Sequence, residues 1–158
     1  MIAKLKYEYW SLFLWILSLI GIGGLIGATT KPELHSWYHQ LLRSPLTPPN
    51  YVFPLVWTIL YGMLGGCGWL LWRQAAQPST IRRLYLLQLV LNWAWTPVFF
   101  GCHLIGSALV ILLLMDVLVS LMLYYAYPYQ RYIMILLIPY LWWLLFASYL
   151  NGYIWYYN

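Results

Sequence analysis

A pair of carboxamides beside an indole is the first arrangement in this chain that could do chemistry. Gln88, Asn92 and Trp95 are separated by four and three residues within an apolar stretch, so a helix would carry all three on one face. An amide buried without a partner costs on the order of 1–3 kcal/mol. The two carboxamides therefore either bond to a neighbouring helix or form the polar rim of a pocket floored by the indole.

Two further tryptophans, Trp57 and Trp143, lie well inside other apolar stretches. Aromatic residues at the ends of such stretches usually form belts at membrane–water interfaces, which fits Trp155 and the tyrosines beside it better than these two. A small residue one helical turn after Trp143 would leave room for a planar ligand to stack on its ring. The residues grouped with the two tryptophans on the same helix faces are Tyr61, Tyr140, Ala147 and Leu150.

Other reactive side chains are few and scattered. Asp116 lies near the middle of an apolar stretch, where a carboxylate is costly and indicates a function. The alternatives are a protonated acid or a hydrogen bond to a Tyr or Ser on a neighbouring helix. His35 and His39 have the spacing of a helical metal pair but no clear third ligand, so we expect no metal site and no required cofactor. The absence of a nucleophile–base pair, paired carboxylates or a phosphate-binding glycine loop argues against hydrolytic and phosphoryl-transfer chemistry.

The composition indicates what surrounds these groups. Of the 158 residues, 64% are hydrophobic and only 7% are charged, whereas a soluble domain carries about 25% charged residues. The missing polar surface must face lipid. The net charge of +5 would suit nucleic acid, but the basic residues form no patch interleaved with aromatics, so we expect membrane lipid as a partner and no nucleic acid.

Five apolar stretches are each long enough to cross a bilayer as a helix, which takes about 20 residues. They are continuous, whereas the strands of a membrane barrel alternate over about ten residues. We therefore predict an all-α integral membrane protein, a bundle of five transmembrane helices in a single domain over residues 1–158. The predicted spans are Tyr9–Ala28, Tyr51–Trp72, Ile81–Gly101, Leu104–Tyr127 and Tyr132–Trp155.

The basic residues predict an orientation. With five spans, the N-terminus shares one side of the membrane with the second and fourth loops. Excess Lys and Arg mark the cytoplasmic side, so we expect a cytoplasmic N-terminus and a C-terminus outside. The N-terminal side carries Lys4, Lys6, Arg73, Arg82, Arg83 and Arg131, and the other side carries Lys31 and Arg43.

Glycines spaced four apart indicate close helix packing. Gly23/Gly27 and Gly62/Gly66 have the small-xxx-small spacing that lets two helices approach. The spacing fits contacts inside one chain or across a homodimer, and the sequence does not choose between them.

The first loop, Thr29–Asn50, is the one long connection in the chain, and long ordered loops are usually lids or binding loops. Trp37 and its neighbours predict one or two helical turns over Ser36–Leu42. The prolines that follow stiffen the descent into the second span. We expect this loop to cover a cavity mouth on the C-terminal side, either as a gate or as a fixed cap. Its proposed lid residues are Trp37, Thr47, Pro48 and Pro49.

Three motifs in order resemble those of the TspO/translocator (TspO/MBR, peripheral benzodiazepine receptor) family, from about Trp37 to the C-terminus. They are Trp37-Tyr38 with Thr47-Pro48-Pro49, Trp57 and Tyr61; Leu91-Asn92-Trp93-Ala94-Trp95 with Phe99-Phe100-Gly101; and Pro139-Tyr140-Leu141 with Trp143, Phe146-Ala147 and Tyr149-Leu150-Asn151. The sequence departs from the family pattern at Leu46, Ser107, Ile111 and Tyr156, the last of which replaces the basic residue of the animal cholesterol motif.

The resemblance implies a five-helix bundle, often dimeric, with one ligand cavity closed by the first loop. Family members bind porphyrins such as protoporphyrin IX and haem, as well as isoquinoline and benzodiazepine ligands, and some bind cholesterol. Some bacterial members promote light-dependent porphyrin breakdown through two tryptophans, whose positions Trp57 and Trp143 match. Matched by motif, the cavity residues would be Trp57, Asn92, Trp95, Trp143, Ala147 and Leu150.

These observations favour a membrane protein that binds protoporphyrin IX, haem or similar planar hydrophobic molecules, in a transport, sensing or tetrapyrrole-regulation role. One alternative is a light-dependent porphyrin-degrading enzyme in which Trp57 and Trp143 face each other and donate electrons. The other is a purely structural bundle whose aromatics only anchor it in lipid.

Overall fold

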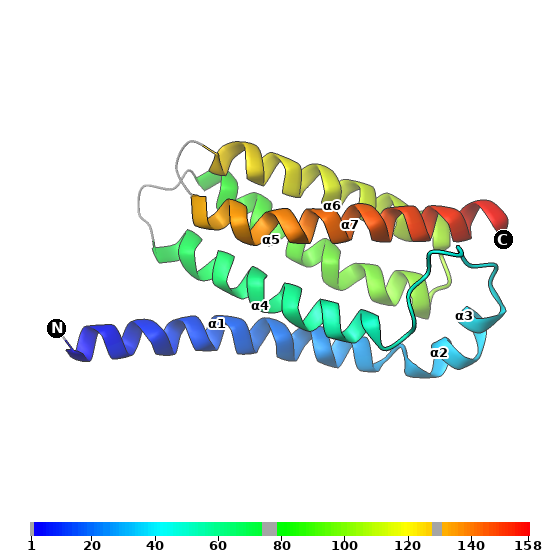
Figure 1. The fold of residues 1–158 in the computed structure, drawn as a ribbon, viewed down its shortest axis with the longest axis horizontal. Helices are drawn as coiled ribbons and strands as arrows, with labels where there is room; N and C mark the ends of the chain where they lie inside the picture. Colours follow the sequence, from blue (N-terminus) through cyan, green and yellow to red (C-terminus); the bar gives the residue numbers. More distant parts are fainter. Residues whose placement is uncertain (1, 74–78, 128–130) are drawn as a thin grey trace.

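In the computed structural model, the described parts of the chain (residues 2–73, 79–127 and 131–158) form helices joined by loops, with no strand among them (Figure 1). Five long helices run side by side, and two short ones lie near the C-terminus (Figure 1). The helices are α1 (Ile2–Ala28), α2 (Lys31–His35), α3 (Trp37–Gln40), α4 (Val52–Arg73), α5 (Ser79–Thr96), the π-helix η1 (Pro97–Gly101), α6 (Ile105–Ala126) and α7 (Arg131–Tyr157).

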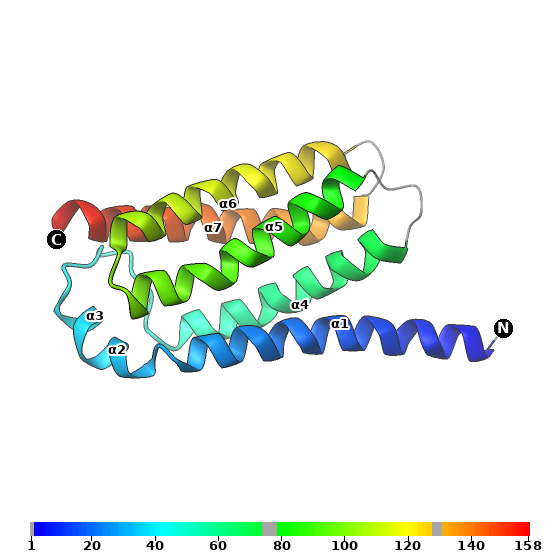
Figure 2. The same cartoon turned by 180° about the vertical axis from the view of Figure 1, so that it is seen from behind.

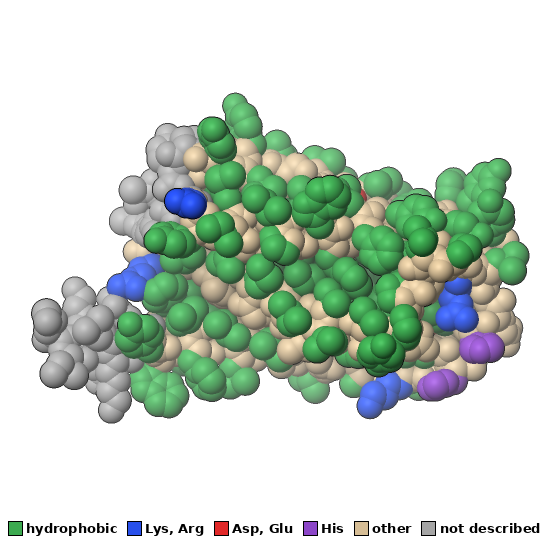
Figure 3. All heavy atoms as spheres, in the orientation of Figure 1, with side chains coloured by type: hydrophobic (Ala, Val, Ile, Leu, Met, Phe, Trp, Pro, Cys, Tyr) green, Lys and Arg blue, Asp and Glu red, His purple; other side chains and the backbone are tan. Residues whose placement is uncertain are grey.

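Five of the helices are long and apolar enough to cross a membrane, with best-window mean hydropathy between 1.2 and 2.5. The predicted fold class, an all-α integral membrane protein with five spanning helices, is confirmed. The face drawn in Figure 3 is mostly hydrophobic, with the blue Lys and Arg side chains confined to its two ends. A belt free of Lys and Arg between two basic ends is what a bilayer favours in a helical bundle.

The third span differs from the prediction in its last turn. We expected one helix to Gly101, but the α-helix ends at Thr96 and a π-helix continues from Pro97. Proline has no backbone N–H to donate four residues back, and such insertions widen a helix locally. The wider turn lies where the chain approaches the short connection to α6.

The five long helices form a ring in which α1 packs on α4, α4 on α7, α7 on α6 and α6 on α5. The ring closes weakly, because α1 and α5 meet only sparsely. Figure 2 shows α1 at the edge of the bundle, next to α4. The core between the helices is filled by leucines and by the buried rings of Tyr85 and Tyr140.

The α1–α4 contact depends on Gly23, a member of a predicted pair, and on Gly65, which lies outside both pairs. A Cβ added to Gly65 would lie 2.7 Å from the Ile16 Cα, so the two backbones touch there. Of the predicted pairs, Gly23 is crowded by Tyr61, whereas Gly27 and Gly62 have nothing within 4 Å. The seam inside this chain is therefore displaced from the Gly62/Gly66 pair that the spacing indicated.

Candidate ligand-binding cavity

A cavity of about 440 Å³ lies inside the ring, at the end covered by α2 and α3. Sites for drug-sized molecules usually measure 300–1,000 Å³. All five long helices contribute to its wall, as do the first loop and η1. From Phe53 to Tyr61 along α4, its wall extends over about 12 Å, since a helix rises about 1.5 Å per residue.

Three of the five cavity residues from α1 are glycines, and the other two are Ile20 and Ala28. The glycines are Gly23, Gly24 and Gly27. A Cβ added at Gly24 or Gly27 would meet nothing within 4 Å, so both positions face open space. The result is a smooth wall against which a flat molecule can lie closely.

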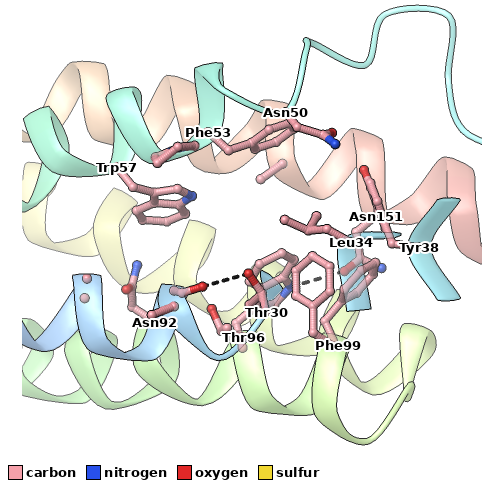
Figure 4. Close-up of a pocket in the computed structure, with 18 of the residues that line it drawn as sticks. Thr30, Leu34, Tyr38, Asn50, Phe53, Trp57, Asn92, Thr96, Phe99 and Asn151 are labelled. Atoms are coloured by element: carbon pink, nitrogen blue, oxygen red, sulfur yellow. Dashed lines mark hydrogen bonds between the residues drawn. The ribbon is translucent and has the colours of Figure 1, made fainter. Parts of the chain in front are cut away.

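Other parts of the cavity lining are aromatic. On α4, the Trp57 and Tyr61 ring centroids are 5.6 Å apart. On α5 and η1, Trp95 and Phe99 stack at 5.1 Å with an angle of 19° between their planes. Figure 4 shows Trp57 and Asn92 at one end of the space and Tyr38 and Asn151 at the other. Aromatic faces of this kind favour stacking with another π-system.

The deep end of the cavity carries a chain of hydrogen bonds that leads into the core. The Tyr61 hydroxyl donates to Asn92 Oδ1 at 2.6 Å, and Asn92 Nδ2 donates to the Tyr140 hydroxyl at 2.9 Å. Tyr140 in turn donates to Gln88 Oε1 at 2.8 Å. Asn92 is thereby fixed in orientation, with one amide N–H left over.

The structure divides the predicted binding residues into two groups. Six line the cavity: Trp57, Tyr61, Asn92, Trp95, Ala147 and Leu150. Three do not: Gln88, Tyr140 and Trp143. Gln88 and Tyr140 are fully buried beyond the polar floor of the cavity, which is the Tyr61–Asn92 pair. Tyr140 accepts a hydrogen bond from Asn92 and donates one to Gln88. Helix α5 carries Gln88 one turn deeper than Asn92, which places it beyond the end of the cavity.

Trp143 packs behind a lining residue. Its ring lies 6.0 Å from that of Phe53, which lines the cavity, and 5.7 Å from that of Phe146. Trp57 makes its ring contact with Tyr61 instead. Among the described residues, Trp57 and Trp143 form no ring contact with each other, so the expected facing pair of indoles is replaced by two indoles in different surroundings.

Several lining residues have no counterpart in the sequence-based set. Asn151 accepts a 3.2 Å hydrogen bond from Trp95 Nε1 and donates to the Ile105 carbonyl at 2.9 Å, so it fixes the indole and joins α7 to the start of α6. Asn151 lies one helical turn after Ala147, and this spacing could have predicted from the sequence that it lines the cavity. The others are chiefly Gly23, Gly24, Gly27, Phe53, Thr96 and Phe99.

The first loop covers the cavity end, but through residues other than those expected. Leu34 of α2 and Tyr38 of α3 line the cavity, whereas the predicted lid residues Trp37, Thr47, Pro48 and Pro49 do not. Trp37 instead stacks on His103 at 4.1 Å and meets the edge of Phe99. The predicted helical turns over Ser36–Leu42 are found as α3, Trp37–Gln40. Burial raises the pKa of the Tyr38 phenol, and the charge of Arg43 only partly offsets this effect, so the lid presents a neutral hydroxyl.

Three sets of polar contacts connect the first loop to the C-terminal end of the bundle, which is the side where we expected the loop to lie. The Asn158 carboxamide accepts from the Leu42 N–H at 3.0 Å and donates to the Leu42 carbonyl at 3.2 Å. Ser44 Oγ and the Tyr149 hydroxyl share a 2.9 Å bond. Glu33 Oε2 lies 3.1 Å from His103 Nε2, an ion pair whenever the imidazole is protonated.

Asp116 lies outside the cavity. Its Oδ2 accepts a 2.7 Å hydrogen bond from Ser148 on α7, and its buried Oδ1 has no partner among the described residues. The expectation of a Ser partner on a neighbouring helix is confirmed. Within the described ranges, no cluster of three or more His, Cys, Asp or Glu side chains could hold a metal ion.

Comparison with known proteins gives a consistent result. The model of the TspO/MBR family matches residues 13–156. The chain is 34% identical over 137 residues to the tryptophan-rich protein TspO of Archaeoglobus fulgidus, covering 86% of this chain and 89% of that protein. It is 35% identical over 142 residues to the translocator protein of Bos taurus, covering 87% and 84%. It is 33% identical over 142 residues to the tryptophan-rich sensory protein of Cereibacter sphaeroides, covering 90% and 88%.

Proposed function

The chain belongs to the TspO/MBR family, and from this premise we propose that it binds planar, largely apolar molecules of the porphyrin or haem type in the cavity. The observation that carries the proposal is the lining of that space: Gly24 and Gly27, which bring no side chain to it, together with the rings of Trp57 and Trp95. A flat aromatic body would bury both its faces there. Relatives named as a translocator protein and a sensory protein support a transport, sensing or tetrapyrrole-regulation role.

The polar floor supports the same proposal. Asn92 uses one amide N–H for Tyr140 and keeps a second on the cavity side of α5. A buried amide that remains free gains from a ligand acceptor, and the ring nitrogens or carbonyls of a flat heterocycle provide one. An apolar slot with a few fixed polar groups is the usual design of a small-molecule site.

A titration tests this proposal. Protoporphyrin IX added to the purified protein should quench tryptophan fluorescence with a micromolar-range midpoint and raise the melting temperature. Replacing Gly24 by Leu should weaken binding at least about tenfold, because the new side chain enters open cavity space without meeting the protein. Gly21→Leu is the matched control, since Gly21 lies on the same helix with equally open surroundings but outside the cavity. If porphyrin changes neither fluorescence nor melting temperature, the proposal is wrong.

A second candidate function is light-dependent porphyrin degradation. Its support is Trp57, an indole on the cavity wall that could donate an electron to a photoexcited porphyrin. Trp143 would act through Phe53, against which it packs. The two candidates differ in one measurable property, the loss of porphyrin absorbance under light.

We further propose that the N-terminus lies in the cytoplasm and the C-terminus outside. Arg73, Arg83 and Arg131 belong to the ends of α4, α5 and α7 that lie on the N-terminal side of the bundle, whereas Lys31 and Arg43 belong to the first loop. Such an excess of basic residues marks the cytoplasmic side. A homodimer, which the family resemblance implies, would place one of the exposed apolar helix faces against a second copy.

A further inference from the structure

The two ends of the cavity differ in their polar groups. The deep end carries the uncharged Tyr61–Asn92 pair. The end under the loop carries Thr30, Lys31 and Asn50, the last from the segment that leads into α4. Lys31 is the cation of this cavity among the described residues. A ligand that fills the space therefore meets neutral groups at one end and a positive charge at the other.

Lys31 has an exposed side chain with no carboxylate partner among the described residues. Among the described side chains, no carboxylate lies within 4 Å of its ammonium group. Glu33, two residues further along α2, is held by other partners: its Oε2 accepts from Ser36 Oγ at 3.3 Å and lies 3.1 Å from His103 Nε2. Asp116 is bonded to Ser148 away from the cavity.

The second basic residue of this end is used differently. The Arg43 guanidinium lies 5.3 Å from the centre of the Tyr38 ring and does not line the cavity. Arg43 thus packs on the Tyr38 ring and is absent from the cavity lining, whereas Lys31 is one of the lining residues. The division leaves one compact, three-donor ammonium group available to a ligand.

We propose that Lys31 recognises the carboxylate edge of the ligand and so sets the orientation of the ligand in the cavity. The inference rests on the proposed function and specifies the orientation of its ligand. In this orientation the planar ring system of the ligand lies between Gly24 and Gly27 of α1 and the Trp57 ring, and its carboxylate points toward the first loop. The Lys31 side chain is exposed, so water and salt partly screen its attraction for a carboxylate, and binding should depend on ionic strength. The Asn50 carboxamide lines the same end and can donate a further hydrogen bond.

Protoporphyrin IX and its dimethyl ester provide the test, because they share one macrocycle and differ in the charge of two side chains. Both are titrated against the protein in nanodiscs of phosphatidylcholine, which carries no net charge. The native protein should bind the diacid about tenfold more tightly than the ester, and the preference should shrink as salt rises. Lys31→Met should weaken diacid binding about tenfold, equal to about 1.4 kcal/mol, and leave ester binding unchanged.

Two variants serve as controls. Lys31→Arg keeps the charge and should keep most of the preference for the diacid. Arg83→Met lowers the net charge equally at the far end of the bundle, where Arg83 is exposed on α5, and should leave both affinities unchanged. Equal loss of diacid and ester binding in Lys31→Met, or no loss of either, would overturn the role of Lys31 while porphyrin binding itself stands. If the native protein binds neither compound, the proposed function is wrong, and this inference with it.

Discussion

The hydroxyl of Tyr61 donates to Asn92 Oδ1 across 2.6 Å, which joins α4 to α5 at the floor of the cavity. Because Asn92 also donates to Tyr140 on α7, one carboxamide links three of the five long helices. Tyr140 is fully buried, so its hydroxyl has no water to replace a lost bond, whereas Tyr61 lies on the cavity wall.

Replacing Asn92 by Leu should therefore lower both stability and affinity. The change removes two buried hydrogen bonds and leaves the Tyr61 hydroxyl without its acceptor, at a cost on the order of 1–3 kcal/mol. Thermal unfolding and porphyrin titration measure the two effects. Tyr61→Phe removes the donor together with its need for a partner and should cost less. A purely structural bundle would lose stability in the same way, so the loss of porphyrin affinity is the result that separates the two accounts.

Light-driven porphyrin loss should depend more on Trp57 than on Trp143. Trp57 lines the cavity, whereas Trp143 packs against Phe53 outside it, and electron donation requires proximity to the ligand. Absorbance of bound protoporphyrin IX is followed under constant illumination in the native protein, Trp57→Phe and Trp143→Phe. Equal bleaching in all three proteins would leave simple binding as the better account.

Trp37→Ala should raise the rate of porphyrin release more than it lowers the melting temperature. The indole lies outside the cavity but stacks on His103, so it ties the loop to the connection between α5 and α6. Stopped-flow release measures the rate, and Tyr149→Phe, which removes only the hydroxyl bonded to Ser44, tests a second tie. An unchanged release rate beside a large loss of stability would identify the loop as a fixed cap.

Gly65→Ala should destabilise the protein, whereas Gly62→Ala should be neutral or stabilising by up to about 1 kcal/mol. The first adds a methyl group 2.7 Å from the Ile16 Cα, where only backbone could move away. The second adds one where nothing lies within 4 Å, and alanine favours a helix over glycine by about that amount. Thermal unfolding of the two variants in the same detergent decides the matter; similar melting temperatures would contradict the close α1–α4 contact.

Cys102 offers a direct test of orientation. It is exposed between η1 and α6 at the loop end, whereas Cys67 is buried in α4. A membrane-impermeant maleimide applied to intact cells should label the native protein if this end faces outward, and Cys102→Ser should abolish the label. Labelling only after the membrane is opened would reverse the proposed orientation.

Continuous apolar runs predicted the five helices correctly, because a bilayer leaves a backbone few alternatives to helix. Predicting which residues line the cavity also requires the way the helices pack against one another, which apolar runs do not indicate. Shared helix faces correctly grouped Asn92 with Trp95. The same rule placed Gln88 with them, but the cavity ends one turn earlier, at a depth that only the packing of α4 and α7 determines.

The sequence-based set of lining residues also omitted the glycines of α1. Sequence reasoning looks for side chains that can touch a ligand, and Gly24 and Gly27 contribute none. Nor could it place Phe53 between Trp143 and the cavity, since that order depends on how α4 and α7 are rotated against each other.

Because Gly24 and Gly27 line the cavity without side chains, a single substitution at either position can narrow it. Open space beyond Gly24 and Gly27 means that a side chain acquired there displaces ligand rather than protein. Alanine at either position would subtract one methyl group from the slot, and larger residues would subtract more, with the helix bundle unchanged. Relatives with this architecture could thus diverge toward thinner or smaller molecules by filling α1, without altering the aromatic wall or the polar floor.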